Sequence, residues 1–320
     1  MAASTVPIID FSAYNLNRNT PDAETYQKLI DDVHHGFTTA GCVYFINHGI
    51  PELAIDNAFQ QSVKFFTLPT ETKVKYSRPD NSNHGYVAIG CESLSADRPG
   101  DYKESFNYIP LEGDANTRIF PNEEVPKFSQ ALTTLYQKCI QLINRILEVI
   151  GRGLPIEDPL LFEKAHEGLN SEANMSTLRT VWYPPIQDDD LKTDQIRCGE
   201  HSDYGSITLV FQDDKGGLQM ACEDGSFMDV KPEKGGVFVN LGYLMERWTS
   251  DTLKARVQRV VNPESSDLKK QACQSLICFV APDKACIIKC VDGSNKYPPI
   301  TSMDFLNMKF GEIYQNFQAD

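Results

Sequence analysis

The spacing of apolar side chains changes near residue 177, and this change limits the possible folds more than any other feature of the chain. Before it, apolar residues recur every three or four positions over 128–149, which predicts one long amphipathic helix. After it, short runs rich in β-branched and aromatic residues are separated by Gly and Pro turns. These runs cover 178–183, 206–212, 217–220, 227–230, 237–241, 256–262, 275–281 and 285–290. Eight short strands at this spacing predict a sandwich or jelly roll.

Further elements are predicted around this β region, and the first third of the chain is mostly helical in pattern. Helices are expected at 21–40, 53–66 and 303–317, and a strand at 42–46. Thr20 supplies a cap residue for the first helix, and Pro21 suits its first helical position. Gly151 and Gly153 are expected to end the long helix. The predicted fold class is therefore mainly β with α, a jelly roll braced by helices.

Composition and charge exclude several classes of protein. The 320 residues are 41% apolar and 23% charged, which is typical of a globular protein. No apolar run approaches 18 residues, and the N-terminus lacks the pattern of a secretory signal, so we expect a cytoplasmic protein, monomeric or weakly dimeric. The net charge of -14 opposes binding to nucleic acid or to an anionic membrane surface. Nine cysteines without a CxxC pair predict reduced thiols and exclude a zinc ribbon.

The segment CGEHSD at 198–203 carries the clearest chemical signal. His201 and Asp203 are two positions apart, so in an extended segment both side chains project to the same side. An imidazole and a carboxylate that converge in this way can occupy two sites on a first-row metal ion. The pattern is common by chance, and its meaning depends on the rest of the sequence.

Several segments resemble the non-haem iron, 2-oxoglutarate-dependent dioxygenases of the isopenicillin N synthase type. The matching segments are 6–10 (VPIID), 36–51 (GFTTAGCVYFINHGIP), 103–106 (KESF), 183–185 (YPP), 199–209 and 237–263. They follow the order of the family over nearly the whole chain. The resemblance implies a distorted jelly roll with a metal site inside the barrel mouth, and Fe(II) and 2-oxoglutarate as its cofactors.

The resemblance also suggests a division of one compact unit into four parts. These are an N-terminal region of mixed helix and strand (1–120), a long bracing helix with its connection (121–176), the jelly-roll core (177–285) and a C-terminal strand and helix (286–320).

The first departure from the family pattern concerns the metal site. The resemblance implies a facial triad of two histidines and one carboxylate, and His201 and Asp203 match its first two members. The second histidine belongs in the segment RVQRVVNP at 256–263, where Gln258 occupies its position. All six histidines lie at or before His201. We therefore expect weak Fe(II) binding, with Gln258 as a weak third ligand.

The second departure concerns the co-substrate. The resemblance implies an Arg-x-Ser pair and a tyrosine that bind the distal carboxylate of 2-oxoglutarate. Tyr183 and Ser275 match two of these positions, but Cys273 replaces the arginine, and no arginine follows Arg259. A carboxylate in this pocket would lack its usual charged partner, so binding of 2-oxoglutarate is doubtful.

Three functions follow from these departures. In the first, the barrel binds a small organic molecule, or binds and converts it, without ordinary 2-oxoglutarate-coupled oxidation. His201 or Asp203 would then act as an acid or base. In the second, the protein is an iron-dependent oxidoreductase for hydroxylation, desaturation or cyclisation that uses His201, Asp203 and a substitute ligand. In the third, it is a catalytically silent binding protein.

Overall fold

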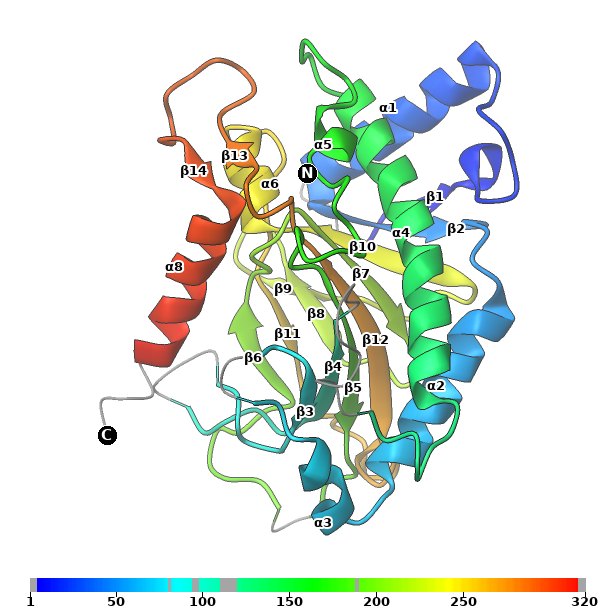
Figure 1. Ribbon diagram of the computed structural model, residues 1–320, viewed down its shortest axis with the longest axis vertical. Coiled ribbons are helices and arrows are strands. Elements are labelled where there is room, and N and C mark those ends of the chain that lie inside the picture. Colours follow the sequence, from blue (N-terminus) through cyan, green and yellow to red (C-terminus); the bar gives the residue numbers. More distant parts are fainter. Residues whose placement is uncertain (1–4, 80–81, 94–97, 110–119, 188–189, 316–320) are drawn as a thin grey trace.

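Two β-sheets face each other in the computed structural model, which describes residues 5–79, 82–93, 98–109, 120–187 and 190–315 (Figure 1). The larger sheet has the order β1 (Ile8–Asp10), β2 (Cys42–Ile46), β10 (Gly236–Leu241), β7 (Ile207–Gln212), β12 (Cys273–Val280), β5 (Thr177–Tyr183), β4 (Glu104–Tyr108) and β3 (Gly85–Val87). The smaller sheet has the order β6 (Cys198–His201), β11 (Gln258–Val260), β8 (Leu218–Ala221) and β9 (Phe227–Asp229). The predicted jelly roll with added helices is confirmed.

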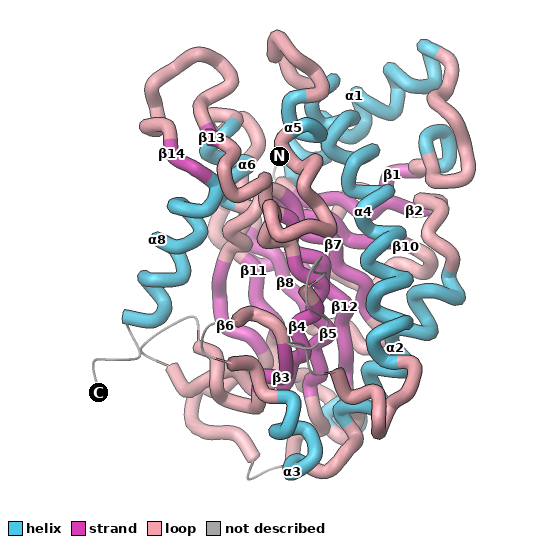
Figure 2. The backbone as a smooth tube through the Cα atoms, viewed as in Figure 1, coloured by secondary structure: helices cyan, strands magenta, loops and turns pink. Residues whose placement is uncertain are grey.

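Helices surround the two sheets, and Figure 2 shows them around the central strands. They are α1 (Ala23–Ala40), α2 (Glu52–Phe66), α3 (Thr70–Lys73), α4 (Phe128–Arg152), α5 (Leu161–Lys164), α6 (Tyr243–Trp248), α7 (Ser266–Lys269) and α8 (Ser302–Gln315), with short 3-10 turns at Ser12–Tyr14 and Val74–Tyr76. The apolar stripe of α4 is buried along its whole length. None of the helices in the described ranges is long and apolar enough to cross a membrane.

The alternation of side chains in the larger sheet produces two separate cores. Leu276 and Cys278 of β12 face the helices, in what we call the outer core, whereas Cys273 and Ile277 face the smaller sheet. The space between the sheets, which we call the barrel interior, is lined by Ala40, Cys42, Tyr44, Val181, Tyr183, Cys198, Val210, Leu218, Met220, Met228, Val230, Phe238, Val260 and Cys273. A single strand therefore contributes to stability through one face and to the interior through the other.

The helix boundaries differ from the predictions in two places. The cap of α1 is Asp22, whose carboxylate accepts a hydrogen bond from the Thr25 amide at 3.0 Å, so Thr20 and Pro21 lie before the helix. Gly151 lies inside α4, where a side chain would collide with the Pro159 carbonyl, and Gly153 ends the helix. The helix predicted at 303–317 is found at Ser302–Gln315, and its last two predicted residues lie outside the described ranges.

The strands differ more than the helices do. The expected strand at 285–290 is reduced to β13 (Ile287–Ile288), which pairs with β14 (Ile300–Thr301) in a separate two-stranded sheet. Strand β6, at the centre of the chemical signal, was not among the predicted strands. The N-terminal third also contributes β1, β3 and β4 to the larger sheet, so it is less helical than its sequence pattern indicates.

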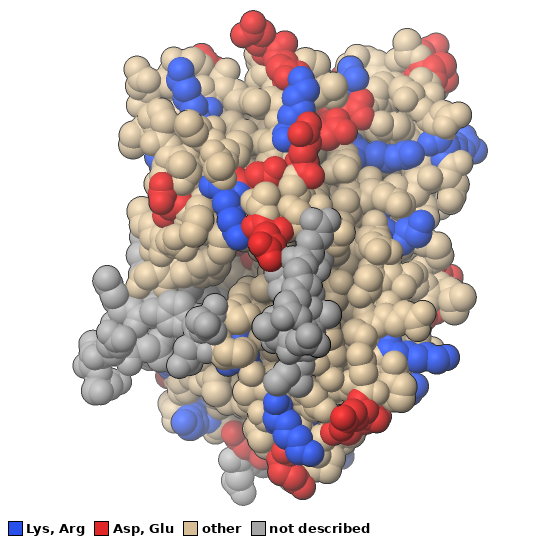
Figure 3. Space-filling model, viewed as in Figure 1, with Lys and Arg blue, Asp and Glu red and all other residues tan. Residues whose placement is uncertain are grey.

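Acidic and basic side chains are scattered over the face seen in Figure 3, singly or in small groups. The net charge of -14 is thus not gathered into a single acidic region on this face.

Candidate functional site

His201 and Asp203 converge at the end of β6, as their spacing predicts. The His201 Nε2 atom lies 3.7 Å from Asp203 Oδ1, and the His201 side chain is 21% exposed while that of Asp203 is 2% exposed. His201 Nδ1 lies 2.8 Å from the Gly199 carbonyl oxygen, to which it donates a hydrogen bond, so Nε2 is directed toward Asp203. Asn240 of β10 donates from Nδ2 to Asp203 Oδ2 at 2.7 Å. Both side chains are therefore held by neighbours, with one imidazole nitrogen and one carboxylate oxygen directed at the same point.

The main chain beside Asp203 is fixed to the start of α6. The Tyr243 amide donates to the Asp203 carbonyl oxygen at 2.8 Å, and the Gly242 amide donates to the Ser206 carbonyl oxygen at 2.9 Å. A side chain at Gly242 would collide with the Gly205 carbonyl, and one at Gly205 would collide with the carbonyl of Val280. Two glycines thus allow three segments of main chain to meet at van der Waals distance behind the His201–Asp203 pair.

Gln258 lies where the sequence places the third member of the triad. Strand β11 pairs with β6 so that Gln258 is directly opposite His201, and Gln258 Nε2 lies 3.5 Å from His201 Nε2. Rotation of the side-chain amide brings its oxygen to the same point. A register shift between Gln258 and Val260 marks a bulge in this pair of strands. The amide is therefore positioned as a histidine would be, with a different donor atom.

The protonation of His201 is set by its neighbours. Burial lowers the pKa of the imidazole, but the Cys198 sulfur, 4.0 Å from Nδ1, and the Asp203 carboxylate outweigh burial and raise the pKa of His201 to about 9. These neighbours favour the protonated imidazole of His201 beside the Asp203 carboxylate. A metal ion bound here would have to displace that proton.

Cys273, Tyr183 and Ser275 lie together on the interior face of the larger sheet. Cys273 of β12 pairs directly with Tyr183 of β5, and Ser275 is two positions further along β12, on the same face. The Cys273 Sγ atom lies 3.3 Å from Asp213 Oδ1. Burial, and then the nearby Asp213 carboxylate, raise the pKa of the Cys273 thiol well above its usual range. Cys273 is therefore a neutral thiol at the position where the sequence resemblance implies an arginine.

Arg197 is a buried charge in this region that the sequence analysis missed. It is 2% exposed, and its Cζ atom lies 5.6 Å from the centre of the Tyr183 ring. Its Nε and one terminal nitrogen have no hydrogen-bond partner among the described residues. Residue 197 is far from position 273 along the chain. It precedes β6 of the smaller sheet, and its guanidinium lies over Tyr183, the partner of Cys273 in the larger sheet. An arginine just before a strand of the metal motif was the available signal.

The side chains fit the cofactors implied by the resemblance only in part. His201, Asp203 and Gln258 supply one imidazole, one carboxylate and one amide, so they match two of the three donors of a facial triad. In the ranges that the structure describes, no three histidine, cysteine, aspartate or glutamate side chains come together as a possible metal site. For 2-oxoglutarate, Tyr183 and Ser275 are in place, and Cys273 is not a cation. No chemical step that depends on either cofactor follows from this arrangement.

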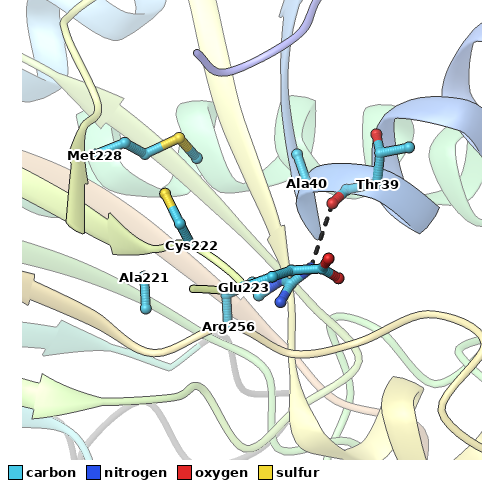
Figure 4. A pocket seen from close by; sticks show the side chains of 7 residues that line it. All are labelled: Thr39, Ala40, Ala221, Cys222, Glu223, Met228 and Arg256. Atoms are coloured by element: carbon cyan, nitrogen blue, oxygen red, sulfur yellow. Dashed lines mark hydrogen bonds and ion pairs between the residues drawn. The ribbon is translucent and has the colours of Figure 1, made fainter. Parts of the chain in front are cut away.

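A small pocket lies elsewhere, between the end of α1 and the smaller sheet (Figure 4). It is lined by Thr39, Ala40, Ala221, Cys222, Glu223, Met228 and Arg256. The Arg256 guanidinium donates to Glu223 at 2.9 Å and to the Thr39 carbonyl at 3.3 Å. Because its charge is paired within the protein, this pocket is not a candidate site for an anionic ligand.

Two family models match the chain. Residues 6–127 match the N-terminal region described as "non-haem dioxygenase in morphine synthesis", and residues 172–279 match the 2OG-Fe(II) oxygenase superfamily. The second match contains β5 to β12, and so includes every candidate site residue named above.

Individual relatives agree with these matches. The 2-oxoglutarate-dependent dioxygenase gloF of Glarea lozoyensis is 30% identical over 86% of this chain and 89% of its own. The 2-oxoglutarate-dependent dioxygenase htyE of Aspergillus rugulosus is 29% identical over 97% of this chain and 99% of its own. Among solved structures, a full-length Neurospora crassa protein in complex with alpha-KG superimposes with a TM-score of 0.85 at 29% identity, covering 97% of this chain and 99% of that one.

Proposed function

The chain belongs to the family of non-haem iron and 2-oxoglutarate-dependent dioxygenases, and on that basis we propose that its barrel binds a small organic molecule without ordinary 2-oxoglutarate-coupled oxidation. The observation that supports the proposal is the amide of Gln258, 3.5 Å from His201 Nε2, where the resemblance implies the second triad histidine. His201 and Asp203 remain available as acid and base for a conversion that needs no oxidant.

The size of the expected change in metal affinity supports this proposal. A neutral amide oxygen is a poorer donor to Fe(II) than an imidazole nitrogen. Loss of a residue that only supports a ligand lowers metal affinity by about 10- to 100-fold, and replacing a ligand should have at least a comparable effect. The metal must also displace the proton of His201. Fe(II) binding is therefore expected to be weak.

The change at Cys273 acts on a separate part of the same chemistry. The family arginine makes a bidentate, charge-assisted contact with 2-oxoglutarate, and each hydrogen bond to a charged group contributes about 1.5–3 kcal/mol. A neutral thiol at Cys273 provides neither hydrogen bond. The keto acid would therefore meet a weakly bound metal ion at one end and no guanidinium from position 273 at the other.

Anaerobic addition of Fe(II) and 2-oxoglutarate tests the proposal, because a keto acid chelated to Fe(II) gives a visible charge-transfer band. We expect no band and no O2-dependent succinate release from the wild-type protein. The double variant Gln258→His with Cys273→Arg should gain the band, and each single variant should gain less. Adding Asp203→Ala to the double variant should abolish it, which controls for adventitious iron.

A second candidate function is an iron oxidoreductase with a substitute third ligand. The observation that favours it is the intact support of the first two ligands, Asn240 Nδ2 to Asp203 Oδ2 at 2.7 Å and His201 Nδ1 to the Gly199 carbonyl at 2.8 Å. A band and succinate release from the wild-type protein would establish this function and overturn the first. Asn240→Ala should then lower the Fe(II) affinity by about 10- to 100-fold.

A further inference from the structure

Arg197 stands out because two nitrogens of its buried guanidinium have no acceptor among the described residues. It precedes β6 directly and is 2% exposed. Its Nε and one terminal nitrogen are buried without a hydrogen-bond partner in the part of the chain that the structure describes. Removing a guanidinium from water without pairing it is strongly unfavourable, and native proteins rarely leave one so. A ligand that accepts these two hydrogen bonds would remove the penalty.

The surroundings of Arg197 place its guanidinium beside residues that line the barrel interior. The guanidinium lies 5.6 Å from the centre of the Tyr183 ring, and its charge acts on the Cys273 thiol. Tyr183 and Cys273 are paired across β5 and β12, and Ser275 follows on the same face. A cation, a phenol and a hydroxyl thus face one region between the two sheets.

The nearby carboxylates are engaged elsewhere. Asp101 forms an ion pair with Lys103 and accepts a hydrogen bond from the Gly199 amide at 2.9 Å. Asp213 accepts from the Lys215 amide at 3.0 Å and from the Gln274 amide at 2.7 Å. Neither carboxylate forms an ion pair with Arg197, so these two described carboxylates leave its charge open to a ligand.

We propose that Arg197 is the anion anchor of the barrel interior and binds the carboxylate of a small organic ligand through Nε and a terminal nitrogen. This inference deepens the proposed function and rests on it in taking the barrel interior as the binding site. The planar guanidinium matches a carboxylate with two parallel hydrogen bonds. The Asp213 carboxylate beside Cys273 disfavours any further anionic group of the ligand at this end of the barrel interior. The carboxylate can belong to a keto acid or to a substrate, and titration with different acids separates these sources.

Calorimetric titration of metal-free protein, prepared over a chelating resin, tests the anchor without involving Fe(II). The probes are 2-oxoglutarate, succinate and benzoate, with succinamide as an uncharged analogue. We expect at least one carboxylate to bind the wild-type protein at millimolar concentration or below, and succinamide not to bind. Arg197→Met should weaken that binding at least about tenfold, the effect of one lost charge-assisted hydrogen bond. Arg197→Lys should be intermediate.

The matched control is Arg259→Met, which removes the same charge from an arginine paired with Glu200 at 2.9 Å on β11. It should leave carboxylate binding unchanged. Preference for 2-oxoglutarate would identify the keto acid as the ligand, and preference for succinate or benzoate would identify a substrate carboxylate. A nitrogen-15 NMR signal from the Arg197 Nε–H, assigned with Arg197→Lys, should shift on addition of the bound acid, and this readout does not depend on the methionine variant folding.

Two results would overturn the anchor. One is a wild-type protein that binds none of the three acids at millimolar concentration, and the other is equal binding by the wild-type and Arg197→Met proteins. A charge-transfer band in the wild-type protein would instead overturn the proposed function and leave the anchor standing, so the two failures are distinguishable.

Discussion

Lys73 and Arg197 are both buried cations, but they lie in different layers of the molecule and are treated in opposite ways. Lys73, 5% exposed on the helix-covered side, lies 2.5 Å from Glu104 Oε2 and also donates to the Phe66 carbonyl at 3.1 Å. Arg197, 2% exposed at the barrel interior, has two nitrogens without an acceptor among the described residues. The charge of Lys73 is paired within the protein, whereas the charge of Arg197 has no ion-pair partner among the described residues.

The difference distinguishes buried polar groups that stabilise the fold from a buried polar group that is available to a ligand. On the outer side Glu104 also accepts a hydrogen bond from Tyr86 at 2.5 Å, so the ion pair is part of a closed network. In the interior, two guanidinium nitrogens of Arg197 lack a hydrogen-bond acceptor among the described residues, and the guanidinium lies over the Tyr183 ring. A buried charge whose partners are all internal contributes to folding, whereas a buried charge without an internal partner needs another explanation, which for Arg197 is the proposed ligand.

The largest expected effect is on stability and comes from breaking the outer ion pair. Lys73→Met should lower the free energy of unfolding by about 3–5 kcal/mol, because it leaves the Glu104 carboxylate buried and unpaired. Arg197→Met should leave the unfolding free energy unchanged or raise it. Urea unfolding measures both.

Lys28→Met is the control for these two variants, because Lys28 forms an exposed pair with Asp32 and should change the unfolding free energy by less than about 1 kcal/mol. An equal loss for Lys73→Met and Arg197→Met would remove the distinction between the two layers.

The next effect uses two successive residues of β12 that face opposite layers. Leu276 is fully buried in the outer core, so Leu276→Ala should lower the unfolding free energy by about 2–5 kcal/mol. Ser275→Ala, at a half-buried position of the interior face, should change it by less than about 0.5 kcal/mol, because it removes only one hydroxyl oxygen and leaves no apolar cavity. Calorimetric titration with the acid that binds best should show weaker binding only for Ser275→Ala. A comparable loss of stability in both variants would contradict the assignment of the two faces.

The smallest expected effect is a pH dependence from the outer side. His166 Nδ1 donates to the Phe162 carbonyl at 2.6 Å and Nε2 accepts from Ser206 at 2.8 Å, and burial lowers the pKa of His166 to about 4. Since the pKa in the unfolded chain is about 6.5, the unfolded state binds the proton first as pH falls. The stability from the neutral form is complete above pH 6.5 and is lost toward pH 4, by about 3 kcal/mol.

Urea unfolding between pH 7 and pH 4 should therefore show a weaker pH dependence for His166→Gln than for the wild-type protein. His35→Gln, at an exposed position of α1, serves as the control and should follow the wild-type curve. Identical curves for all three proteins would contradict a lowered pKa of His166 in the folded protein.

The sequence predicted the outer layer well because that layer depends on local periodicity. The stripe of α4, helices α1 and α2, and the alternating strands of the core follow from patterns within single segments. Strand β6 was missed because Gly199 and Glu200 interrupt its apolar character, and its pairing depends on β11, far along the chain. The residues of β1, β3 and β4 likewise become strands through partners distant in sequence.

The candidate site was predictable where it follows a motif and not where it depends on contacts across the barrel. His201, Asp203, Gln258 and the group around Cys273 could be placed by register with the family segments. Arg197 could not, because its meaning comes from lying over Tyr183. The roles of these residues, the four-part division of the chain, and the expectations of a monomer or weak dimer without nucleic acid or membrane partners stay predictions.

The contact between Gly205, Gly242 and the Val280 carbonyl has a consequence for how this barrel can change over time. Because main-chain atoms make that contact, any side chain added at Gly205 or Gly242 would disrupt it. The position of the His201–Asp203 pair is therefore tied to the start of α6. Position 258 lies on β11, outside this junction, and position 273 lies at the opposite end of β12 from Val280, so neither side chain takes part in the contact. Changes of side chain at these two positions can therefore alter the polarity of the barrel interior without moving the main chain that holds the pair.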